Sequence, residues 1–290
     1  MDITSEQLRK LQLKELEALK ELRWICDENG ISYFLFAGTL IGAIRHKGFI
    51  PWDDDLDVGM TVPNYHAFQE LCKTKLRDGF YLQSPESDPE AGLSYCKLRM
   101  DGTTLIVDYL SDKDIHHGIN IDIYPIYRVP DGSMKRKLQN VAGALYLLMQ
   151  AGQTPQNHGA LLKIGSSVIL FLVRGKNRIR LKNACLKQME KYESTQTKNR
   201  RMMHGNAGLF KYMYQSEIYD NTMLAEFEGE LFSIPERYDD CLRVYYGDYM
   251  QLPPVEQRGA KMKDVVKIDT DKSYKDYKGV YYCKDENGSE

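Results

Sequence analysis

The chain begins with a helical pattern of apolar residues. They recur over residues 5–26, at Leu8, Leu11, Leu16, Leu19 and Ile25, and predict an amphipathic helix with one buried face. Thr4 and Gln7 fit the capping box that starts a helix, and Asn29-Gly30 is a typical helix end. The sequence therefore predicts a helix that packs against the rest of the protein.

Residues 31–126 then alternate between strand-like and helical patterns. Runs rich in β-branched and aromatic residues predict strands over 31–38, 55–60, 79–84, 93–100, 103–109 and 119–126. Short helices are predicted over 39–46, after Gly38-Thr39, and over 64–76, after Pro63. The first half of the chain is therefore predicted to be α+β, with a small mixed β-sheet flanked by helices.

The second half is predicted to be mainly helical. Helical patterns run from about Met134 to about Gln196 with a polar break over 152–159; a looser, glycine-containing segment over 197–235 and a last helix over 236–250 follow. These changes give three parts: a core over 1–133 with its N-terminal helix, a mainly helical region packed on it over 134–258, and a polar tail over 259–290. We expect the tail to lie partly outside the fold.

Composition narrows the class of protein. With 42% hydrophobic and 28% charged residues, the chain is an ordinary globular protein. A net charge of −2 gives no reason to expect a nucleic-acid partner, although a local basic patch stays open. The six cysteines are far apart without a C-x-x-C pair, and the N-terminus lacks a signal-peptide pattern, so we expect reduced thiols in a cytoplasmic protein.

The most apolar stretch is 159–173. It is shorter than the roughly 20 residues that a membrane-spanning helix needs, and Lys163 interrupts it, so a buried helix is favoured. Because basic residues follow directly in 174–182, a helix that rests on a membrane surface is the alternative. Peripheral contact with the inner face of a membrane, through 159–180, therefore stays open.

Four aspartates stand within five positions, at Asp53, Asp54, Asp55 and Asp57. Asp55 and Asp57 are two apart, so on a strand their carboxylates share one face and repel each other. A divalent cation would remove this repulsion, and oxygen-only ligands suit Mg²⁺ or Mn²⁺. Asp53 and Asp54 on the preceding loop would help indirectly and, with Trp52, are substrate-binding candidates. The alternative, a solvated acidic loop, is disfavoured by the apolar flanks.

A third acidic candidate lies in a later strand. Asp122 stands between Ile121 and Ile123, and a buried aspartate there needs a partner. If this strand neighbours the first, Asp122 completes a three-carboxylate cluster with Asp55 and Asp57. A hydrogen-bonded structural aspartate is the alternative.

Phosphate-binding candidates precede the acidic strand. Gly38 and Thr39 mark a strand-to-helix turn, where free N–H groups attract anions. Arg45, His46 and Lys47 would share the charge of a polyphosphate with the metal. For these three residues, a solvated helix C-terminus is the alternative.

Two further pairs of residues carry weaker signals. Lys97 and Arg99 share one strand face and are candidate phosphate contacts, although a plain exposed face explains them equally well. His116-His117 could suggest a transition metal, but without a nearby Cys or third His a pair of surface residues is favoured. Motifs of P-loop enzymes, zinc proteases and serine hydrolases are absent from the sequence.

Three motifs together resemble the LicD family. They are GTLIGAIRHKGFIPWDDDLDVGM at 38–60, GINIDIYPI at 118–126 and ERYDDCLRVYYGDYMQLPP at 236–254. Fukutin and fukutin-related proteins share a related form of the first motif. The resemblance implies a fold similar to the nucleotidyltransferase superfamily, whose Gly-Thr turn, D-x-D strand and third acidic strand match Gly38-Thr39, Asp55/Asp57 and Asp122.

The resemblance also implies a reaction. LicD-like proteins transfer phosphocholine from CDP-choline to a hydroxyl of a teichoic acid, a lipopolysaccharide or a related, sometimes lipid-linked, surface glycan; the fukutin group uses CDP-ribitol. It implies Mg²⁺ on Asp55 and Asp57, Asp122 as a metal ligand or base, and a phosphate at Gly38 and Thr39. Residues 45–47 would stabilise the leaving CMP, and the 134–258 region would face the acceptor.

The donor alcohol comes from the resemblance alone, because no aromatic cluster in the sequence marks a choline site. Trp52, Tyr95, Tyr124 and Tyr127 lie near the motifs and could contact a choline cation. Three other functions stay open: transfer of NMP from an NTP, sugar transfer with a D-x-D motif, and non-catalytic binding of a nucleotide or glycan.

Overall fold

The fold is given by a computed structural model, which describes residues 3–154, 160–259, 262 and 264–284. Side chains are not described for 160–162. Most of the polar break predicted over 152–159 and the end of the predicted tail, 285–290, lie outside the described residues.

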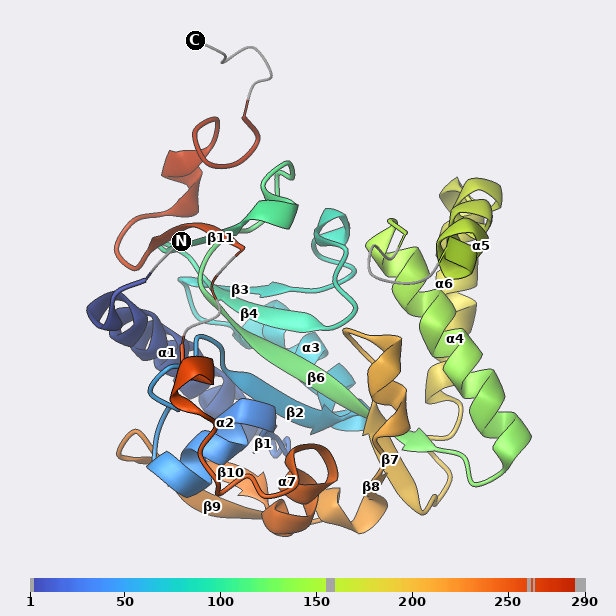
Figure 1. The fold of residues 1–290 in the computed structure, drawn as a ribbon, viewed down its shortest axis with the longest axis horizontal. Coiled ribbons are helices and arrows are strands. Elements are labelled where there is room, and N and C mark those ends of the chain that lie inside the picture. The colour runs from blue at the N-terminus through green and yellow to red at the C-terminus, as the bar shows by residue number, and fades with distance from the viewer. Residues whose placement is uncertain (1–2, 155–159, 260–261, 263, 285–290) are drawn as a thin grey trace.

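The centre of the fold is a mixed sheet with the strand order β1-β2-β6-β4-β3 (Figure 1). These strands are β1 (Phe34–Leu35), β2 (Asp57–Thr61), β6 (Asn120–Val129), β4 (Cys96–Met100) and β3 (Phe80–Gln83). β2 and β6 run parallel, whereas the other neighbours are antiparallel. The far end of β6 pairs with β7 (Asn199–Met202), which pairs with β8 (Tyr214–Gln215). The predicted small mixed sheet is confirmed.

The first helix forms as its sequence predicts. α1 (Ser5–Asn29) begins with the full capping box: the Gln7 N–H donates to Thr4 Oγ1 over 3.2 Å, and the Thr4 N–H donates to Gln7 Oε1 over 3.0 Å. Gly30 ends the helix with a φ of 67°, a conformation that glycine adopts without a Cβ penalty. The cap and the apolar stripe together fix this element.

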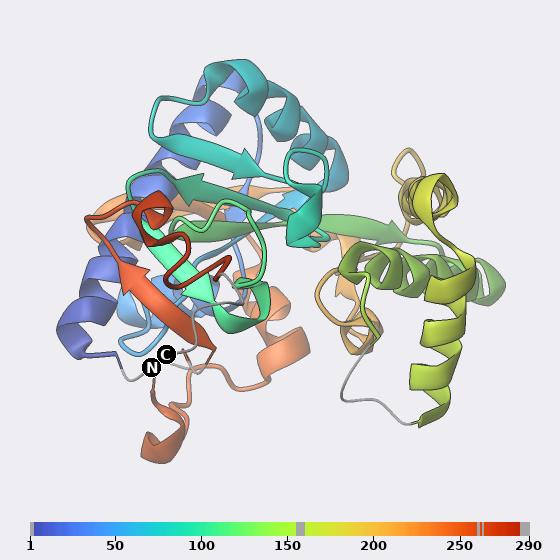
Figure 2. The same cartoon turned by 90° about the horizontal axis from the view of Figure 1, so that it is seen from above.

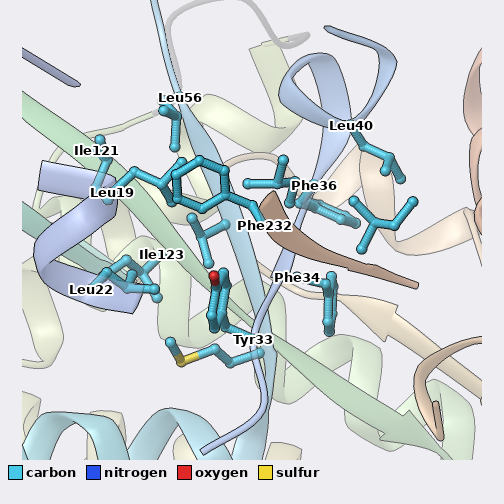
Figure 3. Close-up of a cluster of buried hydrophobic side chains, with 14 of the residues drawn as sticks. Leu19, Leu22, Tyr33, Phe34, Phe36, Leu40, Leu56, Ile121, Ile123 and Phe232 are labelled. Atoms are coloured by element: carbon cyan, nitrogen blue, oxygen red, sulfur yellow. The ribbon is translucent and has the colours of Figure 1, made fainter. Parts of the chain in front are cut away.

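Helices cover one face of the sheet and leave polar side chains on the other. α1 and α3 (Val62–Lys75) both contact β6. Figure 3 shows Leu19 and Leu22 of α1 beside Ile121 and Ile123 of β6 in the buried cluster. Because side chains alternate along a strand, the residues between these isoleucines point to the opposite face. Asp122 therefore lies on the polar face.

A tight contact in the core explains one glycine of the D-x-D strand. A Cβ added at Gly59 of β2 would lie 2.2 Å from the ring of Phe34 on the neighbouring strand. Such a distance is far inside van der Waals contact, so β1 can pair with β2 only if this position has no side chain.

The second half contains more strand than its sequence predicts. Its helices are α4 (Ser133–Ala151), α5 (Ala160–Leu172), α6 (Gly175–Glu190) and α7 (Tyr238–Tyr246). The segment expected to be loose contains β7, β8 and a hairpin of β9 (Thr222–Phe227) and β10 (Glu230–Pro235). α4 and α6 contact each other and, with α5, stand to one side of the sheet in both views (Figures 1 and 2).

Three boundaries differ from the predictions. The strand expected over 31–38 is reduced to β1, and α2 (Ala37–Ile41) starts at its end and continues as a π-helical turn over Gly42–His46. β2 begins at Asp57, so Asp55 lies on the loop before the strand. β11 (Val265–Asp269) pairs with β5 (Thr104–Val107), so this part of the predicted tail belongs to the fold.

Single helical turns complete the fold. They are η2 (Pro89–Ala91), η3 (Asp108–Leu110), η4 (Ala207–Lys211), η5 (Ser216–Tyr219), η6 (Val255–Gln257) and η7 (Tyr274–Tyr277).

The prediction that His116 and His117 are surface residues is wrong. They are only 8% and 1% exposed. Tyr81 stacks on the His116 ring at 5.0 Å, and the Gly118 N–H donates to His116 Nδ1 over 3.1 Å. An unprotonated Nδ1 is needed to accept that bond, and burial lowers the pKa of His116 to about 4.

Acid should therefore destabilise the protein through His116. An unfolded chain takes up this proton near pH 6.5, whereas the folded protein resists it until about pH 4. The free energy of unfolding is thus expected to fall by about 3 kcal/mol from this group as pH drops through that window. Urea unfolding between pH 4 and 8 measures it. His116→Gln should flatten the slope, and a control variant, His66→Gln, should not; equal slopes in wild type and His116→Gln would contradict the assignment.

Candidate active site

A row of charged residues crosses the polar face of the sheet. Asp57 of β2 is the register partner of Asp122 on β6, and Asp122 is the register partner of Lys97 on β4. The Lys97 Nζ lies 2.6 Å from Asp122 Oδ1. The strand adjacency on which the three-carboxylate hypothesis depended is present.

Asp57 is held at the start of its strand by the preceding turn. Its N–H donates to Thr39 Oγ1 over 2.8 Å, and its carbonyl accepts the Phe36 N–H over 2.9 Å. Thr39 therefore joins α2 to the acidic strand instead of capping its own helix, whose N-cap is Phe36. This contact fixes the Gly-Thr turn beside the aspartate.

Negative charge accumulates around Asp57. Burial raises the pKa of Asp57 well above its usual value, and the neighbouring carboxylates of Asp55, Asp122 and Asp53 raise it further; Lys97 acts in the opposite direction. The carboxylates gathered around Asp57 therefore repel one another. A divalent cation would offset this repulsion.

Asp122 already has four hydrogen-bond donors. Oδ1 accepts from Lys97 Nζ at 2.6 Å and Asn120 Nδ2 at 2.8 Å, and Oδ2 accepts from the hydroxyls of Tyr95 at 2.9 Å and Tyr124 at 3.1 Å. An ionised carboxylate offers about four lone-pair sites, so all of them are in use. Binding a metal or accepting a proton at Asp122 requires one of these donors to move.

Helix α1 holds the acidic loop through hydrogen bonds to its backbone. The Gln12 Nε2 donates to the carbonyls of Asp53 over 2.9 Å and Ile50 over 3.4 Å. One turn further, Glu15 is 1% exposed, and burial together with Asp55, Asp54 and Asp53 raises its pKa well above the usual value. Among the described residues Glu15 Oε2 has no hydrogen-bond partner. Glu15 is not among the predicted site residues, although its position four residues from both Leu11 and Leu19 places it on the buried stripe.

Gly38 is the point where the acidic loop touches the Gly-Thr turn. A Cβ there would lie 2.8 Å from Asp53 Oδ2. The loop carboxylate therefore approaches the backbone of α2 closely, and a side chain at position 38 would require the Asp53 carboxylate to move.

The basic segment after α2 meets the C-terminal part of the chain. Arg45 Nη1 donates to the Tyr249 carbonyl over 2.5 Å, and its Nε donates to His46 Nε2 over 2.9 Å. The guanidinium of Arg258 lies 5.5 Å from the centre of the Trp52 ring. Burial lowers the pKa of Arg45 and the charge of Arg258 lowers it further, whereas Asp53 acts in the opposite direction. The sequence analysis missed Arg258, because it lies in a segment without a recognisable motif.

Two of the predicted phosphate-binding residues, Lys47 and Arg99, make contacts of a different kind in the structure. Lys47 is exposed, and its carbonyl accepts the N–H of Glu228 in the β9–β10 turn over 2.8 Å. Arg99 is 4% exposed, and its guanidinium donates to Gln83 Oε1, to the Gly118 carbonyl and to Asn120 Oδ1. An exposed strand face therefore does not describe Arg99; it acts on the row of charges through Asn120.

The donor chemistry of the acidic loop fits a hard divalent cation, because every candidate ligand is a carboxylate oxygen. Among the described residues, no group of three or more His, Cys, Asp or Glu side chains is placed so that it could hold a metal ion. The repulsion on Asp57 supports a cation at Asp55 and Asp57, and Asp53 lies beside them. The donors on Asp122 make it the weakest of the predicted ligands.

Removing the positive charge of Lys97 should destabilise the folded protein. The two side chains of the Lys97–Asp122 pair are 15% and 13% exposed. Lys97→Met is expected to lower the free energy of unfolding by about 2 kcal/mol, between the values typical of exposed and buried pairs. Urea titration checks it, with Lys73→Met as a matched control, because Lys73 pairs with Glu70 in the open. Equal stability of the two variants would contradict this role of Lys97.

Comparison with known proteins adds a second kind of evidence. Residues 30–143 match the family described as LicD/FKTN/FKRP, nucleotidyltransferase domain. Over 260 residues the chain is 30% identical to the lipopolysaccharide cholinephosphotransferase LicD of Haemophilus influenzae. The aligned stretch covers 87% of this chain and 94% of that protein. The chain belongs to the LicD family. This LicD-family protein is also 26% identical over 103 residues to the ribitol 5-phosphate transferases FKRP of mouse and human, a stretch that covers 36% of this chain and 18% of theirs.

Proposed function

We propose that this LicD-family protein transfers phosphocholine, or a similar phospho-alcohol, from a CDP-activated donor to a hydroxyl of a surface glycan or its precursor. The acceptor would be of the lipopolysaccharide or teichoic acid type, and CMP would be released. The strongest support is the Haemophilus relative, a lipopolysaccharide cholinephosphotransferase that aligns with 87% of this chain. The charged row of Asp57, Asp122 and Lys97 beside the Gly-Thr turn supports phosphoryl transfer independently.

In the proposed step, the acceptor oxygen attacks the phosphorus that carries the alcohol. A bond forms between that oxygen and the phosphorus, and the bond from the phosphorus to the bridging oxygen breaks, so its electron pair leaves with CMP. Asp55 and Asp57 would hold a Mg²⁺ or Mn²⁺ ion, which supplies positive charge to the phosphate oxygens. The hydroxyl proton would pass to Asp122 after Tyr95 or Tyr124 releases Oδ2.

Basic residues at the edge of the site would receive the leaving group. Arg45 is hydrogen-bonded to His46, and both His46 and Arg258 lie against the Trp52 ring. The anionic phosphate of CMP would gain two cations there, and Trp52 offers a ring face next to them. Gly38 and Thr39 would stay at the donor phosphate.

A donor panel tests the proposal. The full chain is incubated with CDP-choline, CDP-ribitol, CDP-glycerol or NTPs, with and without Mg²⁺, in the presence of a glycan acceptor, and CMP and pyrophosphate are measured. Mg²⁺-dependent release of CMP from a CDP-alcohol is expected. Pyrophosphate release from an NTP would replace the proposal with NMP transfer, and nucleotide binding without turnover of any donor would replace it with a binding function.

The helices α4–α6 carry a charge that differs from the rest of the chain. Residues 132–189 contain ten Lys and Arg residues and no Asp or Glu, whereas the whole chain has a net charge of −2. On α5, four exposed apolar residues form one stripe: Ile164, Val168, Phe171 and Leu172 are 62%, 50%, 65% and 70% exposed. The sequence predicted a buried helix over 159–173. This prediction is wrong for the four apolar residues of the stripe, which are exposed. None of the helices in the described part of the chain combines the length and hydropathy that a bilayer crossing demands.

We propose that this surface, α5 with the basic start of α6, contacts an anionic membrane. An apolar stripe beside basic residues is the pattern of a helix that lies in a lipid interface, and a lipid-linked acceptor would be found there. Vesicle co-sedimentation tests it: binding to vesicles with anionic lipid is expected, and Phe171→Ser should weaken it. Leu224→Ser is the control, because Leu224 on β9 is 60% exposed. Equal binding of wild type to neutral and anionic vesicles, or no binding, would contradict the proposal.

A further inference from the structure

A cavity lined by aromatic rings lies beside the row of charged residues formed by Asp57, Asp122 and Lys97. Its volume is about 140 Å³. Its aromatic walls come from three parts of the chain that are distant in sequence: Phe36 before α2, Tyr212 and Tyr214 around β8, and Tyr245 and Tyr246 at the end of α7. Figure 1 shows α2, α7 and β8 grouped at the same end of the molecule. Tyr245 and Tyr246 are 45% and 38% exposed, so the cavity reaches the surface.

The cavity adjoins the residues proposed to hold the donor phosphate. Phe36 lines it with its ring and donates its N–H to the Asp57 carbonyl over 2.9 Å. Ala37, which also lines the cavity, directly precedes Gly38 of the Gly-Thr turn. On the other wall, burial raises the pKa of the Tyr246 hydroxyl, and the charge of Asp57 raises it further. A donor with its phosphate at this turn can therefore reach the cavity with its alcohol.

Three of the rings that line the cavity contact one another at steep angles. Tyr245 packs edge-to-face with Tyr212 and with Tyr246, with ring centres 4.7 Å apart in both pairs and interplanar angles of 68° and 80°. Rings at such angles present their faces in different directions, and the face of a tyrosine attracts cations. Lys211 already lies over the Tyr212 ring, 4.9 Å from its centre.

We propose that this aromatic cavity receives the quaternary ammonium group of a choline-type donor. The inference rests on the proposed function and adds the residues that select the alcohol. Cavities of about 150 Å³ admit a molecule the size of benzene, so a trimethylammonium group fits. Its methyl groups need no hydrogen bonds, whereas a polyol such as ribitol would leave several hydroxyls against apolar walls. The cavity therefore favours choline over ribitol or glycerol.

Direct binding tests the cavity without turnover. Choline and its neutral carbon isostere, 3,3-dimethylbutanol, are titrated into the full chain, and the shifts of tyrosine ring signals are followed by NMR. Choline is expected to bind about tenfold more tightly, because only the charged group gains from the ring faces. Equal affinity, or shifts at other tyrosines only, would overturn the assignment. This measurement holds whether or not CDP-choline is a substrate.

Kinetics then test the role of the cavity in the reaction. Tyr245→Leu is expected to raise the KM for CDP-choline about tenfold with a smaller change in kcat, because it removes binding that substrate and transition state share. Tyr245→Phe keeps the ring and should retain most of the affinity. Tyr281→Leu, which removes a ring from a different cluster, is the control.

The two proposals fail in different ways. If wild type releases CMP from CDP-choline but Tyr245→Leu and Tyr246→Leu keep its KM, the cavity assignment is wrong and the proposed function stands. If wild type turns over CDP-ribitol and not CDP-choline, the choline donor is wrong, and the cavity assignment falls with it unless choline itself binds there.

Discussion

Replacing Asp57 by Asn is expected to lower kcat by at least about a thousandfold, because charge stabilisation by a bound cation is worth several kcal/mol in the transition state. The change keeps the size of the side chain and its place in β2, where the backbone of Asp57 is held by Thr39 and Phe36. The loss should therefore appear in turnover and not in the fold. Steady-state kinetics with the donor that the panel identifies measure it.

Stability should change in the opposite direction. Asp57 is half-buried among carboxylates, and burial and these neighbours raise its pKa, so keeping this side chain in the fold costs stability at neutral pH. Asp57→Asn is expected to unfold at a higher temperature than wild type without added metal. Loss of activity with a gain in stability marks a functional carboxylate, whereas a structural one would lose both.

The control for Asp57→Asn is Asp112→Asn, which alters an exposed aspartate outside the row of charged residues. It should leave both kcat and the unfolding temperature close to wild type. A rate for Asp57→Asn within about tenfold of wild type is too small a change for loss of a cation-binding carboxylate and would sink the proposed mechanism.

Chelation with EDTA is expected to abolish turnover and to lower the unfolding temperature, because the proposed cation would offset the repulsion among Asp53, Asp55 and Asp57. The pH dependence has a definite sign. The pKa of Asp57 is raised in the folded protein, so the stability that its protonation provides is complete below the unfolded value near 4 and is lost as pH rises through the folded value. The shift in unfolding temperature caused by Mg²⁺ should therefore grow as pH increases.

Differential scanning calorimetry with Mg²⁺ or EDTA at several pH values checks this expectation. Each comparison is made at one pH, so the acid effect of His116 cancels. Asp57→Asn should show a much smaller response to Mg²⁺. Full activity after exhaustive chelation, together with an unfolding temperature that does not respond to Mg²⁺, would contradict a metal at these aspartates.

The sequence by itself determined the elements whose signals are local. The apolar stripe and capping residues of α1 fix that helix, since each contact joins residues within one or two turns. Composition and the run at 38–60 were enough to pick out the aspartates and the Gly-Thr turn, and the resemblance to LicD proteins added the reaction. The strand before that turn was overestimated, because its apolar run was read as strand pairing although only two residues pair.

Only the tertiary structure decided how these residues meet. The register that sets Asp57 against Asp122, and Asp122 against Lys97, depends on strand pairs between distant segments, which local periodicity does not encode. The burial of Glu15 and Arg99 and the assembly of the aromatic cavity have the same origin: each arises where elements far apart in the chain pack together. The residue types of the candidate site could therefore be identified from the sequence. The burial of these side chains, their hydrogen-bond partners and the charges around them depend on how distant elements pack.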